Sequence, residues 1–154
     1  MKIRKAVIED VDAAIDLLKE FQEESLKEYG INLDIATIQE TCRKYEGSTL
    51  VAEEDGKIIG IIAGTVIRIP TFTTPIYLES VWYVSKMHRR VGIHLLKTLE
   101  ELCKSQGISH IILAHMMNSK ADKLGEFYRR SGFVPYEINY IKKLEGGKNE
   151  NAPA

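Results

Sequence analysis

The strand-like run IYLESVWYV, residues 76–84, holds a single charged residue, Glu79. Alternation along a strand places every second residue from Tyr77 to Tyr83, Glu79 included, on one face, and both faces are largely apolar. An ionised carboxylate is costly there unless it is paired with a cation or opens on a wet cleft. Glu79 is therefore either half of a core ion pair, for instance with Arg68, or a group that binds an ammonium ion and takes its proton.

Directly after this run, the segment HRRVGIHLL at residues 88–96 places cations before a glycine and the start of an apolar helical pattern. The first backbone N–H groups of a helix have no partner within the helix, and with the positive end of the helix dipole they form an anion site. Gly92 lets the backbone approach a bulky anion, and Arg89 and Arg90 add charge beside it. A pyrophosphate suits this arrangement. The alternative is a solvated basic turn in which Gly92 serves packing.

The elements that must position these residues follow from the hydrophobic periodicity. Strands are predicted at residues 2–7, 49–53, 57–69, 76–84, 109–115 and 133–143, and helices at 11–29, 35–45, 89–106 and 118–130. Asp10 is predicted to cap the first helix, Gly132 to end the last one, and Glu54-Asp55-Gly56 to form a hairpin turn. This order, without a repeat or a linker, predicts one α/β domain over residues 1–144, followed by a disordered tail at 145–154.

Composition narrows the class of protein. With 21 basic and 22 acidic residues, the chain lacks the excess of positive charge that favours a nucleic-acid partner. Cys42 and Cys103 lie far apart and the four histidines do not share helix or strand spacings, so no metal site is predicted. No apolar run approaches the ~20 residues of a membrane span, and the N-terminus lacks the apolar core of a signal peptide. We expect a cytoplasmic protein without a membrane partner.

Arg89-Arg90-Val91-Gly92-Ile93-His94 fits the pattern Arg/Gln-x-x-Gly-x-Gly/Ala at all but its last position, where His94 replaces a small residue. With four further segments in matching order, it makes the chain resemble the GCN5-related N-acetyltransferase (GNAT) superfamily over residues 2 to about 143. These segments are Ile3-Arg4-x-Ala6 followed by Asp10, Val81-Trp82-Tyr83-Val84, Asn118-x-x-Ala121 and Phe127-Tyr128-x-x-x-Gly132-Phe133. The resemblance implies a mixed, mostly antiparallel central sheet of about six to seven strands, flanked by about four helices.

The resemblance also implies acetyl-CoA as cosubstrate, since this family holds its pyrophosphate at the arginine-to-glycine segment. The residues implied in cofactor binding are Trp82, Tyr83, Val84, Arg89, Arg90, Val91, Gly92, Ile93, His94 and Asn118. Backbone N–H groups from Trp82 to Val84 would contact the thioester carbonyl and the pantetheine arm. Glu79 matches the strand of the family's general base, and Tyr128 the position of the acid that protonates the thiolate. The structural alternatives are a core aromatic residue for Tyr128 and a helix N-cap for Asn118.

The function expected from the resemblance is an acetyl-CoA-dependent N-acetyltransferase that acts on a primary amine of a small molecule. The alternatives are acetylation of a protein N-terminus or lysine, and a catalytically idle acyl-CoA-binding module. Asp16, Glu20, Glu23 and Glu24 on the first helix either attract a basic acceptor or form an ordinary solvated face. A homodimer is a further expectation, because relatives often pair through late strands.

Overall fold

The structure is a computed structural model of the 154-residue chain, and it describes residues 1–44, 46–118 and 120–145. The chain divides into two compact units, Met1–Ala114 and His115–Ala154. Among the described residues, the first unit holds the sheet and the first three α-helices, and the second holds the last α-helix. Residues 146–154 of the predicted tail lie outside the described residues, and the predicted domain limits stay a prediction.

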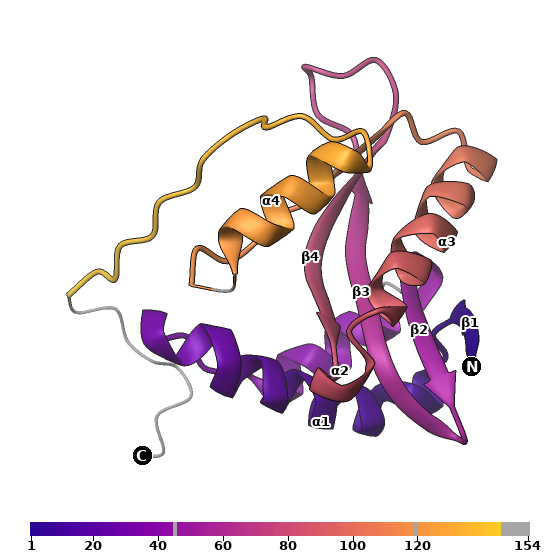
Figure 1. The fold of residues 1–154 in the computed structure, drawn as a ribbon, viewed down its shortest axis with the longest axis vertical. Coiled ribbons are helices and arrows are strands. Elements are labelled where there is room, and N and C mark those ends of the chain that lie inside the picture. Colours follow the sequence, from indigo (N-terminus) through magenta and orange to yellow (C-terminus); the bar gives the residue numbers. More distant parts are fainter. Residues whose placement is uncertain (45, 119, 146–154) are drawn as a thin grey trace. The chain divides into compact units, whose positions relative to one another are not determined.

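The first unit is built on a five-stranded sheet with the strand order β1-β2-β3-β4-β5. The strands are β1 (Lys2–Lys5), β2 (Thr49–Glu54), β3 (Lys57–Ile67), β4 (Ile76–Val84) and β5 (His110–Ile112). Each of the first three strands pairs antiparallel to the next, and β5 joins β4 in parallel (Figure 1). The predicted mixed, mostly antiparallel sheet is confirmed, with five strands in the described chain instead of six or seven.

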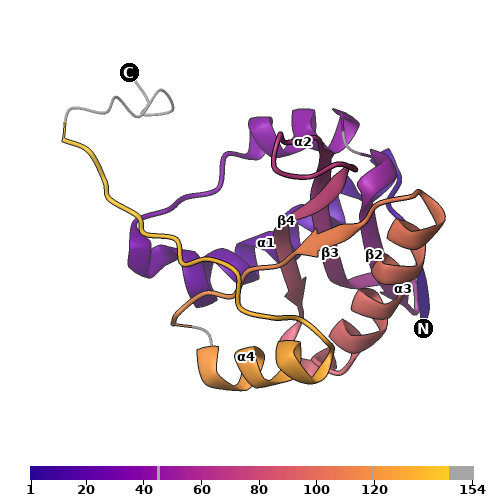
Figure 2. The same cartoon turned by 90° about the horizontal axis from the view of Figure 1, so that it is seen from above.

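Helices of the first unit cover both faces of this sheet (Figures 1 and 2). They are α1 (Val11–Phe21), α2 (Ile35–Lys44) and α3 (Val91–Ser105). Neighbouring residues of β2 show the division, because Leu50 packs in one apolar cluster and Val51 in the other. The first cluster contains the buried side of α3, and the second contains the buried side of α1.

Residues 11–29 are helical throughout, but the helix changes type along its length. After α1, a π-helical turn covers Gln22–Leu26 and a 3₁₀ turn covers Lys27–Tyr29. The Lys27 N–H donates to the Gln22 carbonyl five residues back, which widens the helix. The Leu33 N–H donates to Oε1 of Gln22 at 2.7 Å and ties the following segment to this turn. Side chains in the widened turn therefore leave the spacing of a regular helix.

The strand β4 contains a bulge at Ser80. Ala63 of β3 pairs with Val81, and the next residue, Gly64, pairs with Glu79, so Ser80 is left over between them. An extra residue of this kind shifts the alternation of side chains by one position. Residues before and after Ser80 that a regular strand would place on one face consequently lie on opposite faces.

The two apolar clusters record this shift. Tyr77 packs with Trp82 and Val84 in the cluster beside α3, whereas Tyr83 packs in the cluster beside α1. The predicted common face for every second residue from Tyr77 to Tyr83 is therefore wrong, because the bulge reverses the alternation after Glu79. Glu79 comes before the bulge, so its side chain lies on the same side of the sheet as that of Tyr77, two residues earlier in the strand.

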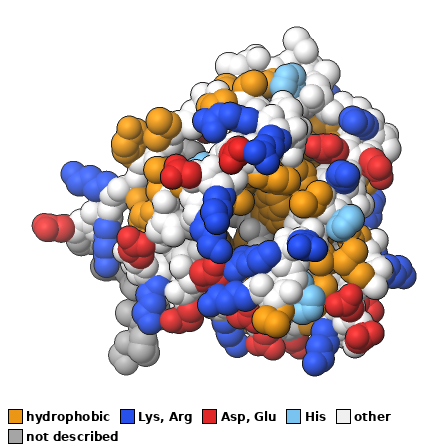
Figure 3. All heavy atoms as spheres, viewed as in Figure 1, with side chains coloured by type: hydrophobic (Ala, Val, Ile, Leu, Met, Phe, Trp, Pro, Cys, Tyr) orange, Lys and Arg blue, Asp and Glu red, His pale blue; other side chains and the backbone are white. Residues whose placement is uncertain are grey.

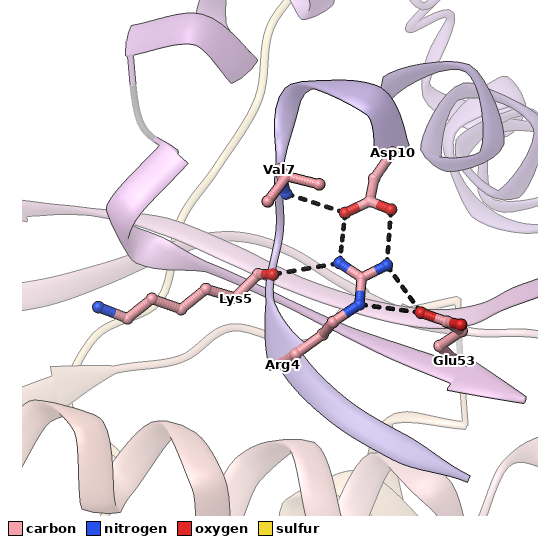
Figure 4. A network of polar contacts seen from close by, with 5 residues as sticks. All are labelled: Arg4, Lys5, Val7, Asp10 and Glu53. Atoms are coloured by element: carbon pink, nitrogen blue, oxygen red, sulfur yellow. Dashed lines mark hydrogen bonds and ion pairs between the residues drawn. The ribbon is translucent and has the colours of Figure 1, made fainter.

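Arg4 joins β1 to β2 and to the start of α1 (Figure 4). Its guanidinium donates to both carboxylate oxygens of Asp10 at 2.7 and 2.8 Å and, through Nε, to Oε2 of Glu53 at 2.9 Å. The Val7 N–H donates to Oδ2 of Asp10 at 2.9 Å. The hydrogen bonds from Arg4 lower the pKa of Asp10. Asp10 stands at the predicted N-cap position of α1, but its side chain makes no hydrogen bond to the helix, because Arg4 and Val7 hold its carboxylate.

The predicted hairpin turn is confirmed between β2 and β3. Asp55 and Gly56 have φ values of 49° and 73°, the left-handed pair that a two-residue hairpin turn requires. In the second unit, Gly132 has a φ of 89° just after α4 (Ala121–Arg130), which confirms its predicted place at the helix end. The start of α4 differs from the prediction, because Lys120 and not Asn118 stands at its N-cap position.

The last predicted strand, at residues 133–143, is wrong: the described chain from 133 to 145 contains no strand. A strand needs a neighbour to accept and donate its backbone hydrogen bonds, and Pro135 has no N–H to give. Apolar side chains in this segment are strongly exposed, including Val134 at 81% and Tyr140 at 91%. The apolar alternation therefore predicted a strand, but this segment forms no strand with any described part of the chain.

Candidate active site

Glu79 lies on β4 at the point where β5 leaves it. The parallel pairing of the two strands ends with Leu78 and Ile112, although β4 itself continues to Val84. Just beyond this point the Ala114 N–H donates to Oε2 of Glu79 at 3.0 Å. The carboxylate therefore satisfies a backbone group that has already left the sheet.

The Glu79 side chain is half-buried and forms no ion pair within the described part of the chain. Burial raises the pKa of Glu79 to about 7, and the single hydrogen bond from Ala114 offsets only part of that effect. The core ion pair with Arg68, one of the two sequence interpretations, is not formed. A carboxyl group with this pKa can take up and release a proton near neutral pH, as a general base does.

The bulge places Gly64 of β3 opposite Glu79. A Cβ atom on Gly64 would lie 2.7 Å from Cε1 and Cζ of Tyr77 and even closer to the Leu78 carbonyl oxygen. The Tyr77 hydroxyl donates to the Ser48 carbonyl at 2.9 Å, and the Ser48 hydroxyl donates to the Gly64 carbonyl at 2.7 Å. These contacts fix the backbone that carries Glu79, and they require the absence of a side chain at Gly64.

The other end of β4 leads through Ser85 and a 3₁₀ turn, Lys86–His88, to the start of α3. Arg89 and Arg90 follow in helical conformation, and α3 begins at Val91. No side chain caps this helix start, and its first turn carries no acidic residue. The positive end of the α3 dipole therefore has no side-chain cap and no acidic residue in its own first turn.

Gly92 is buried in the first turn of α3. Its N–H and that of Ile93 donate to the carbonyls of Arg89 and Arg90 at 3.2 and 3.3 Å. A Cβ atom on Gly92 would lie 3.4 Å from Cζ2 of Trp82, which is an ordinary contact distance. Packing within the chain therefore does not demand glycine here, whereas the close approach of a bulky anion to the backbone would.

Arg89 is paired with a carboxylate from the π-helical turn. Its Nη2 donates to Oε1 and Oε2 of Glu24 at 2.8 and 2.7 Å, and its guanidinium carbon lies 4.9 Å from the centre of the Tyr83 ring. The Tyr83 hydroxyl also donates to Oε2 of Glu24 at 2.7 Å. Burial opposes the ionisation of Glu24, but the hydrogen bonds from Tyr83 and Arg89 outweigh it and lower the pKa of this carboxyl.

Sequence spacing did not reveal this role of Glu24, which it grouped with the other acidic residues of the first helix. Two of those face outward beside lysines: Asp16 lies 3.4 Å from Lys19, and Glu23 lies 3.1 Å from Lys27. Glu24 alone among these three turns toward β4. Glu24 lies in the π-helical turn, which the residue pattern does not predict.

Comparison with known proteins identifies the family. The sequence profile of the Acetyltransferase (GNAT) family matches residues 12–133. The chain belongs to the acetyltransferase (GNAT) family. No curated protein sequence matches it.

Solved structures share the fold of this GNAT chain. Ribosomal-protein-alanine N-acetyltransferase from Brucella melitensis biovar Abortus 2308 superposes with a TM-score of 0.73 at 16% identity, over 93% of this chain and 98% of that one. An acetyltransferase from Trypanosoma brucei gives 0.70 at 22% identity, over 93% and 99%. An aminoglycoside acetyltransferase from an uncultured soil metagenomic sample, in complex with sisomicin, gives 0.71 at 16% identity, over 94% and 96%. These likenesses establish the fold.

Members of the GNAT family use acetyl-CoA, and the first unit of this chain brings most of the predicted cofactor residues together. Trp82, Tyr83 and Val84 end β4, and the segment Arg89–His94 opens α3. His94, the departure from the family pattern, is exposed. The uncapped helix start, its two arginines and the lack of a nearby acid in the first turn fit the diphosphate of this cosubstrate. Asn118 lies in the second unit.

Tyr128 also belongs to the second unit of this GNAT chain, where other rings surround it. The ring centres of His115 and Phe133 lie 6.0 and 5.9 Å from that of Tyr128, and the Phe133 N–H donates to the Tyr128 carbonyl at 2.9 Å. Nδ1 of His115 is buried and has no hydrogen-bond partner among the described residues. Tyr128 is therefore held in an aromatic group, and its role as general acid stays a prediction.

Three further observations describe the GNAT chain. Among the residues that the structure describes, no three His, Cys, Asp or Glu side chains gather as a metal site. None of the described helices combines the length and apolar composition of a bilayer-spanning helix. The face shown in Figure 3 carries basic and acidic side chains mixed together, in keeping with the balanced composition.

Proposed function

We propose that the chain transfers an acetyl group from acetyl-CoA directly to a primary amine of a small molecule, with Glu79 as base and Tyr128 as acid. The observation that carries this proposal is the state of Glu79. It is a half-buried carboxyl group that has no cation partner in the described chain and a pKa raised to about 7, at the point where β4 and β5 part. Membership of the GNAT family supplies the reaction class, and Glu79 supplies the base.

Acetyl-CoA supplies the acetyl group as a thioester. The backbone N–H groups at the start of α3 would bind its diphosphate, with Arg89 and Arg90 adding charge-assisted hydrogen bonds. The β4 segment from Trp82 to Val84 continues past the end of its pairing with β5, so its backbone groups on that side can contact the thioester carbonyl and the pantetheine arm. Both parts lie in the first unit, on consecutive elements of the chain.

The acceptor must lose a proton before it reacts. A lysine-like amine has a pKa near 10.4, so about one molecule in a thousand or fewer is neutral at pH 7. Ionised Glu79 binds the ammonium group and takes one proton, directly or through water. The nitrogen lone pair then attacks the thioester carbonyl, so that the C–N bond forms and the C–S bond breaks. Tyr128 gives its hydroxyl proton to the departing thiolate, and the acetylated nitrogen loses its second proton to water, from which Tyr128 regains its own.

One neighbour in fold is a ribosomal-protein-alanine N-acetyltransferase, and another is an aminoglycoside acetyltransferase in complex with sisomicin. We favour a small cationic amine, because the ionised Glu24 beside Tyr83 supports binding of positive charge close to β4. Protein acetylation and an idle acyl-CoA-binding module are the alternatives. We also propose that the protein acts in the cytoplasm and as a homodimer.

Two measurements on the full chain test the function. Calorimetric titration with acetyl-CoA should show saturable binding, and a thiol-release assay should show turnover with members of a panel of polyamines and aminoglycosides. Turnover with peptides alone would favour protein acetylation. Binding without turnover would favour the idle module. An absence of heat with natively folded protein would refute the proposed cosubstrate.

A further inference from the structure

The ion pair between Glu24 and Arg89 joins the π-helical turn to the start of α3. The Glu24 side chain is 26% exposed and that of Arg89 is 43% exposed. Only Nη2 of Arg89 contacts the carboxylate, and Nε and Nη1 have no hydrogen-bond acceptor among the described residues. The guanidinium is thus held by one nitrogen and by the Tyr83 ring, in a position that solvent reaches.

The proposed function gives Arg89 a second anion to bind. A diphosphate offers more charge and more acceptor oxygens than one carboxylate, and the uncapped start of α3 favours it further. Nε and Nη1 can make the first contacts with the diphosphate, and a guanidinium that turns fully toward this larger charge takes Nη2 away from Glu24. Glu24 then keeps the hydrogen bond from the Tyr83 hydroxyl and the weaker attraction of Lys86, but it loses its hydrogen-bonded cation.

We propose that Glu24 and Arg89 are an exchange pair: the coenzyme diphosphate takes Arg89, and Glu24 then receives a cationic group of the acceptor amine. This inference rests on the proposed function and adds a specificity residue to it. A partly buried carboxylate that has lost its partner regains stability by binding another cation. An ammonium group of the acceptor can supply that cation, so the acceptor class is an amine with a second positive charge besides the reacting group.

The exchange predicts coupling between the two substrates. The coenzyme should increase the affinity for a polycationic amine, and the amine should increase the affinity for the coenzyme by the same factor. Without an amine, the Glu24–Arg89 pair should weaken coenzyme binding, because the pair must first open. Removing the charge of Glu24 should therefore strengthen binding of the coenzyme and abolish the coupling.

The first test is a titration with CoA, by calorimetry, of the wild-type chain, Glu24→Gln and Glu23→Gln. We expect Glu24→Gln to bind CoA about three- to tenfold more tightly, the range of a partly exposed ion pair. Glu23→Gln removes the same charge one residue away, from a side chain whose ion-pair partner among the described residues is Lys27, and should match the wild type. Thermal unfolding confirms that the variants are folded. Unchanged or weaker binding by Glu24→Gln would overturn the exchange, because the pair would then only orient Arg89.

An Arg89→Gln background isolates the pair. There, adding Glu24→Gln should change CoA affinity less than about twofold, because no arginine is left to release. A full effect of Glu24→Gln in that background would also overturn the exchange. If the wild-type chain binds no CoA, the proposed function itself fails; if it binds CoA but Glu24→Gln gains nothing, only the exchange fails.

Spermidine probes the cationic half of the proposal. We expect the wild-type chain to bind spermidine at least about threefold more tightly when CoA is saturating, and Glu24→Gln to lose this gain. Glu23→Gln should retain it. Spermidine binding that is absent, or that is equal with and without CoA, would show that released Glu24 does not receive a second cation.

Discussion

Glu79 and Glu24 are two carboxyl groups beside the same strand, and they differ in charge state. Glu79 stands on β4 with one backbone N–H as its donor, and burial raises its pKa to about 7. Glu24 reaches Tyr83 of β4 from the π-helical turn, and donors from Tyr83 and Arg89 lower its pKa in spite of burial. Burial acts on both, more strongly on Glu79, and only at Glu24 do hydrogen-bond donors outweigh it. One carboxyl group can exchange a proton near pH 7, and the other is a fixed charge.

The bulge at Ser80 keeps these two environments apart. Glu79 lies on the side of Tyr77 and the α3 cluster, while Tyr83, which binds Glu24, packs in the α1 cluster. A regular strand would have placed Glu79 and Tyr83 on the same face. One unpaired residue thus separates a group suited to proton transfer from a group suited to holding charge.

Replacement of Glu79 by glutamine should have the largest effect on activity. We expect Glu79→Gln to lower kcat/KM about 100-fold or more, because the amide keeps the shape of the side chain but cannot accept the proton. Its rate should also lose the rise with pH around the wild-type pKa of about 7, while acetyl-CoA affinity stays near that of wild type. Thiol-release kinetics from pH 6 to 9 and calorimetry measure the two quantities.

The matched control for this variant is Glu101→Gln, which removes one charge from an exposed position on α3. It should leave both the rate and the pH profile unchanged. A pH–rate profile of Glu79→Gln that matches the wild type would remove Glu79 from the role of base, and the comparison with Glu24 would then have no catalytic meaning.

A substitution at Gly64 tests the role of the bulge. We expect Gly64→Ala to lower the free energy of unfolding by about 2 kcal/mol, because its Cβ would collide with the Tyr77 ring and the Leu78 carbonyl. Gly92→Ala is the control within the same sheet-and-helix unit, since its Cβ would meet Trp82 at 3.4 Å. It should change stability by less than about 1 kcal/mol and gain some helix propensity.

Urea unfolding compares these two glycine variants, and CoA titration separates them further. Gly92→Ala should weaken CoA binding in spite of its normal stability, because the added methyl group stands where the diphosphate approaches the backbone. Equal stability of the two variants would show that the bulge tolerates a side chain at Gly64. Wild-type CoA affinity in Gly92→Ala would show that the coenzyme does not approach this turn.

The sequence predicted the elements of the first unit well, because periodicity and turn chemistry are local. The strand at residues 76–84 and the Asp55–Gly56 turn are where the pattern placed them. The sequence pattern did not predict two features, the bulge at Ser80 and the π-helical turn at Gln22–Leu26. Each depends on how a segment pairs with a distant one: β3 fits its residues to β4, and Leu33 bonds to Gln22.

For the same reason, the sequence predicted only part of the candidate site. Residue type and family pattern located Glu79 and the segment Arg89–His94, but the electrostatic state of a carboxyl group depends on partners far away in sequence. Ala114 and Glu79 are 35 residues apart, and Glu24 and Arg89 are 65 apart. The exposed segment from 133 to 145 shows the converse, because its apolar alternation suggested a strand although no described strand pairs with it.

Tyr128→Phe tests the acid that would complement Glu79. We expect turnover to fall about tenfold, less than for Glu79→Gln, because a thiolate with a pKa near 8.5 already leaves readily at neutral pH. Acetyl-CoA affinity should stay near wild type, since the phenylalanine ring can keep the contacts with His115 and Phe133. Single-turnover thiol release measures the chemical step. Full activity of Tyr128→Phe would show that the thiolate leaves unaided or is protonated elsewhere, and Glu79 would then act without it.

The contrast between Glu79 and Glu24 should also appear, on a smaller scale, in the pH dependence of stability. The pKa of Glu79 rises on folding from 4.5 to about 7, so its contribution is present below pH 4.5 and is lost as pH rises through 7. Glu24 has a lowered pKa, so its contribution is present above its ordinary value of 4.5 and is lost as pH falls. Relative to wild type, Glu79→Gln should therefore gain about 1–2 kcal/mol between pH 5 and 8, after allowance for the residual hydration of a half-buried group. Glu24→Gln should lose stability above pH 5 and approach the wild type in acid. Urea unfolding at pH 4 to 8 measures both slopes, and slopes of equal sign would mean that the two carboxyl groups share one electrostatic environment after all.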